Sequence, residues 1–139
     1  MREVTVNIKG TQHSGAGDDC IEYFTVGKFG QRDGRFCISY DDSTSFGLQG
    51  VTTTLHIDED KKVVLQRSGP VQSRLTVEKG QRNLCHYGME FGSAMLGVFG
   101  ETIKNELNQN GGRLYMSYTL DINSSLLSKN ELEIVVEEV

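Results

Sequence analysis

The chain has 139 residues, of which 37% are hydrophobic and 24% are charged, and its formal net charge is -5. A chain of this length forms about one domain, which we expect to span residues 1–139 and to bury a core without metal or disulfide staples. The acidic balance, with no run of Lys and Arg longer than two residues, argues against nucleic acid and membrane surfaces as partners.

The sequence predicts a cytoplasmic protein. Its first ten residues, MREVTVNIKG, alternate like a strand and lack the apolar core of a secretory signal. No window reaches the ~18 apolar residues of a membrane-spanning helix. The three cysteines are odd in number, far apart and without a C-x-x-C pair, which is typical of a reducing compartment; they are Cys20, Cys37 and Cys85.

Two hairpins are predicted in the first forty residues. Residues 3–12 form a candidate strand, and His13–Asp19 is expected to be a polar loop. Asp33-Gly34 is a strong two-residue turn between strands at 20–31 and 35–40. This turn pairs Arg32 with Arg35 and keeps Cys20 far from Cys37, so a disulfide between those cysteines is not expected.

Four more strands follow in the middle of the chain, separated by the acidic turn Asp58-Glu59-Asp60, by Ser68-Gly69-Pro70 and by Gly80. Turn signals at about ten-residue intervals are typical of a β-sandwich or barrel. The predicted strands cover residues 51–57, 62–67, 73–79 and 83–91.

The segment 94–109 supports two interpretations. A four-residue spacing of apolar side chains favours a helix that ends at Gly111, and it is carried by Met95, Phe99, Ile103 and Leu107. A change of parity near Gly100 favours a strand with a bulge there. We prefer the bulged strand.

The clearest alternation comes after Asn110-Gly111, which we predict to be a type I′ turn. One face of this strand is apolar and the other, with Asp121, is polar. The last predicted strand is residues 131–138. The apolar face consists of Leu114, Met116, Tyr118, Leu120 and Ile122.

Ten antiparallel segments with one apolar face each have to hide that face and their open edges. We therefore predict an all-β fold, a closed or nearly closed antiparallel up-and-down β-barrel of 8 to 10 strands. The interior of such a barrel is filled by side chains or holds one small ligand.

Several motifs resemble the YwiB-like family of uncharacterised bacterial proteins from about residue 3 to the C-terminus. They are Arg67-Ser68-Gly69, the stretch YGMEFG at 87–92, and Gly111-Gly112-Arg113-Leu114 followed by Ser117, Tyr118, Leu120 and Ile122. The resemblance implies a calycin or lipocalin-like barrel, a bacterial cytoplasm and, by analogy, an apolar ligand. It implies no activity, because a fold does not carry a function with it.

Arg67 is the leading candidate for a ligand-binding residue, because it shares the inward parity of Val63 and Leu65. A guanidinium there could bind an acidic ligand, or it could pair with Glu22, Glu90 or Glu101 of the protein. Three tyrosines on apolar faces could orient the same ligand or simply pack in the core; they are Tyr23, Tyr40 and Tyr118.

Other chemistries have no sequence support. His13, His56 and His86 do not have the spacing of a metal site. Asp41-Asp42 and Asp58-Glu59-Asp60 lack the calcium-loop pattern, and no phosphate-binding glycine motif is present, so we predict no cofactor.

The first functional hypothesis is therefore a non-enzymatic barrel that binds a small apolar or amphipathic molecule in its interior. The alternative is a solid barrel that acts as an interaction module, as a homodimer or with a partner. Apolar residues in apparent loops motivate this alternative, namely Phe46, Phe99 and Leu126-Leu127. An enzyme ranks last, because no nucleophile, base and orienting group can be assembled from the spacing.

Overall fold

The computed structural model describes residues 1–15, 17–41, 51–69, 72–89 and 92–139, with backbone alone for 87–89 and 92–94. Phe46, Pro70 and Glu90 lie outside this range. All ten elements in it are strands. The described residues include no helix of the length and hydropathy that a membrane span requires.

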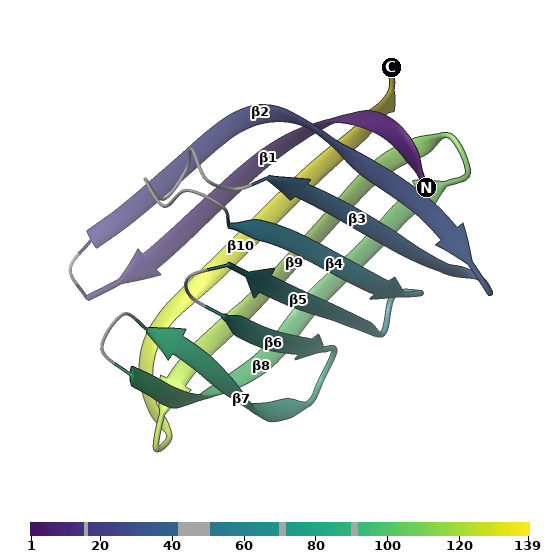
Figure 1. The fold of residues 1–139 in the computed structure, drawn as a ribbon. Helices are drawn as coiled ribbons and strands as arrows, with labels where there is room; N and C mark the ends of the chain where they lie inside the picture. Colours follow the sequence, from purple (N-terminus) through teal and green to yellow (C-terminus); the bar gives the residue numbers. More distant parts are fainter. Residues whose placement is uncertain (16, 42–50, 70–71, 90–91) are drawn as a thin grey trace.

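Consecutive strands pair antiparallel, and the first also pairs with the last, so the sheet closes into the predicted up-and-down barrel (Figure 1). The strands are β1 (Arg2–Ser14), β2 (Gly17–Arg32), β3 (Arg35–Asp41), β4 (Thr52–Asp58), β5 (Lys62–Ser68), β6 (Ser73–Glu78), β7 (Arg82–Met89), β8 (Gly92–Asn108), β9 (Gly111–Ile122) and β10 (Ser125–Glu138).

The core fills the inside of the barrel because apolar residues alternate with polar ones along each strand. On β3, for example, Ile38 is fully buried while Arg35 is exposed. Phe29 and Phe36 stack with ring centroids 5.7 Å apart. Each such buried side chain stabilises the fold by about 1.5–3 kcal/mol. Other side chains buried to less than 2% exposure include Leu55, Ile57, Leu114, Met116 and Ile134.

The long segment before the β8–β9 hairpin is a strand, as we preferred, and not a helix. Its register shifts between Gly100 and Thr102, so the predicted bulge is confirmed. Glycine is needed at this position, because a Cβ atom on Gly100 would overlap the carbonyl oxygen of Glu78.

The predicted turn at Asn110-Gly111 is wrong by one residue. The hairpin loop is Gln109-Asn110, closed by the pair Asn108 and Gly111. The side chain of Asn108 accepts a hydrogen bond from the Asn110 amide at 2.8 Å, which stabilises the loop. Gly111 and Gly112 do have positive φ, of 123° and 127°, but they lie inside β9.

Two other predicted boundaries are wrong because the barrel ladder extends polar segments. His13 and Asp18 are not in a loop but face each other at the ends of β1 and β2, with His13 Nδ1 3.0 Å from Asp18 Oδ1. The last strand begins at Ser125 instead of 131, so Leu126 lies on a strand. Phe99 also lies on a strand, β8.

The barrel has two ends, which we name by their contents. The terminal end carries both chain termini and the turns at Asp33-Gly34, Glu59-Asp60 and Gln109-Asn110. The distal end carries the β1–β2 and β9–β10 turns.

Two seams of the sheet differ in regularity. Between β1 and β10 the pairing runs unbroken from Val4 opposite Glu138 to Ser14 opposite Ser128. Between β6 and β7 the strand ladder in the described residues consists of Ser73 opposite Tyr87. One isolated bridge also joins the turn after β6 to β8.

Candidate functional site

A row of polar side chains crosses the inner face of the barrel near its distal end. Thr53 on β4 lies opposite Tyr40 of β3 on one side and opposite Arg67 of β5 on the other. Arg67 in turn lies opposite Ser73 of β6. We call these four residues the polar layer. Thr53, Tyr40 and Ser73 are buried, and Arg67 is half-buried.

The predicted tyrosines lie on the inner face around this layer. Tyr23 contacts Tyr40 edge to face, with ring centroids 6.4 Å apart. Tyr118 is half-buried and packs against the core from β9. The fold therefore aligns Arg67 with Tyr40 through Thr53 and adds Tyr23 to the same cluster.

Arg67 has its Nε atom buried, and the residue takes part in a polar, ring or electrostatic interaction within the protein. Two of the carboxylates considered as its partners face elsewhere. Glu101 lies 3.7 Å from Lys129, and Glu22 is exposed opposite Lys9. Burial of a guanidinium is costly unless polar groups surround it, and the layer supplies hydroxyls for that purpose.

The interior towards the terminal end of the polar layer is packed with apolar side chains. Along β3, β4 and β5 the next inward residues are Ile38, Leu55 and Leu65, which are at most 3% exposed. The polar layer thus lies over a solid core, so a molecule bound at this layer meets packed side chains beneath it.

A large cavity lies at the other end of the barrel, and no local sequence signal predicts it. Its volume is about 1210 Å³. Phe29, Phe36 and Ile57 contribute its apolar part, and Gln109 of the β8–β9 turn borders it. Five cationic side chains also line it, namely Arg2, Arg32, Arg35, Lys62 and Arg74.

Cys37 and His56 face each other across β3 and β4 in the lining of this cavity. Burial raises the pKa of the Cys37 thiol, with a smaller opposing effect of the N-terminal charge. A thiol with a raised pKa is a poor nucleophile, so the pair does not resemble an activated Cys–His site. The described residues contain no group of three side chains that could hold a metal ion.

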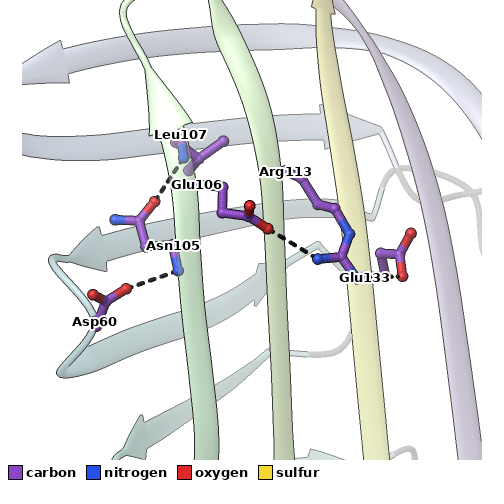
Figure 2. A network of polar contacts seen from close by, with 6 residues as sticks. All are labelled: Asp60, Asn105, Glu106, Leu107, Arg113 and Glu133. Carbon is purple, nitrogen blue, oxygen red and sulfur yellow. Dashed lines mark hydrogen bonds and ion pairs between the residues drawn. The ribbon is translucent and has the colours of Figure 1, made fainter.

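A polar network on the outer face fixes the strands near the terminal end (Figure 2). Arg113 donates hydrogen bonds to Glu106 and Glu133, both at 3.0 Å, and this arginine holds the pKa of the Glu133 carboxyl below its usual range. The backbone amide of Asn105 on β8 donates to Asp60 at 2.8 Å, which anchors the β4–β5 turn. These contacts connect neighbouring strands and one turn.

An ion pair lies flat on the outer face at Gly97. Arg82 of β7 donates two hydrogen bonds to Asp121 of β9, at 2.6 and 3.0 Å, across the intervening strand β8. A Cβ atom on Gly97 would lie 2.5 Å from both partners, so any other residue would displace the two side chains from this position. Asp121, predicted on the polar face of its strand, is 9% exposed.

Exposed apolar side chains surround this ion pair. Leu84, Gly97, Asp121 and Leu126 are successive partners across four strands, and Met95 and Phe99 flank Gly97 on β8. Four of these residues form what we call the outer patch: Leu84, Met95, Phe99 and Leu126, with exposures of 65%, 54%, 38% and 68%.

Comparison with known proteins places the chain beside proteins without an assigned activity. A family described as "Domain of unknown function (DUF1934)" matches residues 6–134. The uncharacterized β-barrel protein YwiB of Bacillus subtilis (strain 168) is 24% identical over 119 residues, which are 86% of this chain and 82% of that protein. The crystal structure of the ywiB protein from Bacillus subtilis superimposes with a TM-score of 0.84 at 21% identity, over 99% of this chain and 92% of that one. This likeness shows the barrel fold.

Proposed function

The chain belongs to the DUF1934 family, a domain of unknown function, and we propose that it is a non-enzymatic, calycin-like barrel that binds a small amphipathic molecule at its distal end. The observation that carries this proposal is the polar layer, in which an inward arginine is aligned with three hydroxyl side chains. Binding sites for small molecules typically combine apolar walls with a small number of polar groups that point to the same place.

The polar layer favours a ligand with an acidic head group. The guanidinium of Arg67 can exchange its present interaction for a two-pronged hydrogen bond to a carboxylate, a geometry for which arginine is well suited. The hydroxyls of Tyr40 and Thr53 can donate to the same oxygen atoms.

The apolar part of the ligand would lie against Tyr23 and Tyr118. It has to be short, because Leu55 and Leu65 fill the interior beneath the layer. A medium-chain carboxylic acid has the size and the polarity that these surroundings accept, whereas a long lipid tail does not.

Titration with octanoate, followed by NMR of the tyrosine and arginine side chains, tests this proposal, with octan-1-ol as the uncharged counterpart. We expect saturable octanoate binding that is about tenfold weaker in Arg67→Gln, because a charge-assisted hydrogen bond contributes about 1.5–3 kcal/mol. Tyr40→Phe removes one hydroxyl alone and should weaken binding less. Lys28→Gln, which removes an outer-face charge, is the matched control.

Two results would reject the proposal. In the first, octanoate shows no saturable binding, and native mass spectra of protein taken fresh from cells show no retained small molecule. In the second, octanoate binding is unchanged in a folded Arg67→Gln variant.

For the cellular setting we propose a bacterial cytoplasm. All three cysteines are free thiols, which suits a reducing compartment. Alkylation of intact cells with a membrane-impermeant thiol reagent should leave the exposed Cys20 unmodified.

A second candidate function is that of an interaction module, and the outer patch favours it. Grouped apolar side chains on a surface usually mark a contact with another protein. We propose a homodimer through the outer patch and expect light scattering over a concentration series to detect it. Leu84→Lys should weaken the dimer, whereas Phe24→Lys, at a 66% exposed position on β2, should not. A monomer at every concentration rejects this candidate.

A further inference from the structure

The cavity at the terminal end carries a charge opposite to that of the chain as a whole. Its five cationic side chains and two carboxylates, Asp33 and Asp58, give it a formal charge of +3. The whole chain has a formal charge of -5, so all other residues together carry -8. Fourteen Lys and Arg residues are present in the chain, and more than a third of them line this one cavity.

Three of these cations are available to a ligand. Within the described part of the chain, the side chains of Arg32, Lys62 and Arg74 make no hydrogen bond or ion pair. The other two are partly committed. Arg2 lies 3.2 Å from Glu138 and stacks over the Phe29 ring, and Arg35 lies 3.7 Å from Asp58.

We propose that this cavity binds a compact polyphosphate group, either free or as part of a nucleotide. A concave wall of low dielectric concentrates the field of the cations that line it, so several of them act together on one multiply charged anion. Arginine offers the forked donors that match phosphate oxygens, and lysine adds a point charge.

The surroundings of the cavity favour a compact anion over a polymer. Asp33 and Asp58 stand among the cations, and the rest of the chain is strongly acidic. A long nucleic acid would extend over this acidic surface and be repelled by it. A triphosphate stays within the cavity, whose volume of about 1210 Å³ is at least as large as the roughly 300–1,000 Å³ of ordinary ligand sites.

The probe for this proposal is tripolyphosphate, titrated into the full-length protein by calorimetry at low ionic strength. We expect saturable binding that weakens as salt is added, because the contacts are exposed charges. The triple variant Arg32→Gln, Lys62→Gln, Arg74→Gln should bind about tenfold more weakly, since each exposed contact contributes a small share.

A matched variant distinguishes the loss of cavity contacts from the effect of a lower net charge. The triple variant Lys9→Gln, Lys28→Gln, Lys129→Gln also removes three positive charges, but from positions outside the cavity lining. Its affinity for tripolyphosphate should stay within about twofold of that of the unmodified protein, as expected of positions that do not touch the ligand. Circular dichroism of both variants establishes that they fold. Equal losses in the two variants would overturn the proposal.

Two further titrations identify the source of the phosphate. Adenosine triphosphate that binds as tightly as tripolyphosphate indicates that the phosphates alone are recognised, and tighter binding indicates a nucleotide. Both results support the cavity as a polyphosphate site. No saturable binding of either probe, or tighter binding of a single-stranded oligonucleotide, overturns it.

Discussion

The two seams of the barrel provide hydrogen-bond partners for neighbouring strands in different ways. At the β1–β10 seam, the backbone ladder continues without a break from Val4 to Ser14 of β1. At the seam around β6, side chains replace much of that ladder. The Thr76 amide donates to the Cys85 sulfur at 3.3 Å, and Asn83 donates to Glu78 at 3.3 Å.

The difference arises from the length of β7. This strand begins only at Arg82, which lies opposite Phe99, so the second half of β8 has no β7 partner. The turn residues fill the gap, because the Gly80 amide donates to the Gly100 carbonyl at 2.8 Å and the Asn105 amide donates to Asp60. A barrel can therefore close without a complete ladder, provided that its buried polar groups find other partners.

Removal of a large core side chain should have the largest effect, and it should be similar at both seams. Ile134 of β10 and Leu75 of β6 are 0% and 3% exposed. Ile134→Ala and Leu75→Ala should each lower the free energy of unfolding by about 2–5 kcal/mol, because each leaves a cavity. Urea denaturation measures both. A cost below about 1 kcal/mol for Leu75→Ala would mean that the irregular seam is also loosely packed, contrary to its burial.

Gly100→Ala should have the next largest effect and should act at the irregular seam. The added Cβ atom would press on the Glu78 carbonyl, which belongs to the backbone and cannot rotate away. We expect a loss of about 1–3 kcal/mol, as for other overpacked sites. Gly15→Ala is the control, since its Cβ atom would meet open space. Equal melting temperatures of the two variants would contradict this account.

Cys85→Ala tests whether the sulfur replaces a ladder hydrogen bond. The thiol is buried, and without it the Thr76 amide loses its acceptor. We expect a loss of about 1–2 kcal/mol and faster hydrogen exchange of the Thr76 amide. Cys20→Ala, at an exposed position, should change stability by less than about 0.5 kcal/mol. Unchanged hydrogen exchange of the Thr76 amide in Cys85→Ala would contradict the idea that the sulfur replaces a ladder hydrogen bond.

The smallest expected effect is on the pH dependence of stability. The hydrogen bond from Arg82 lowers the pKa of Asp121 in the folded state. A group with a lowered folded pKa stabilises the fold above its unfolded pKa of about 3.9, and this contribution is lost as the pH falls through the folded value. Asp121→Asn should therefore flatten the decline of stability below about pH 4. Asp19→Asn, at an exposed position, should leave that decline unchanged. If stability fell equally steeply with pH in both variants, Asp121 would not be the group responsible.

Most of the fold was predictable because strand periodicity and turn residues are local signals. The bulge at Gly100 followed from a change of parity, and the Asp33-Gly34 turn fixed the register of β2 and β3. The predicted loop at 13–19 was too long, because the polar residues at both of its ends are held in strands by partners across the ladder. Such pairing is a tertiary effect that local polarity does not reveal.

The candidate sites were predictable only in part. The inward parity of Arg67 and the tyrosines followed from alternation along single strands. The terminal-end cavity was missed, because its cations come from five strands and gather only when those strands pair. The ion pair of Arg82 and Asp121 was missed for the same reason, although Gly97 within an alternating strand was a signal of close approach.

The regular seam also means that the two chain termini emerge side by side, with Val4 opposite Glu138. A short glycine-rich linker can therefore join them, and new ends can be opened at the exposed Asp33-Gly34 turn. Such a circular permutant would turn the most distant pairing in the chain into a local hairpin. The pairing that spans the whole chain would then be the shorter one between β2 and β3, from Gly27 opposite Tyr40 to Arg32 opposite Arg35. Fewer contacts would depend on end-to-end loop closure, so the permutant should refold faster than the natural order.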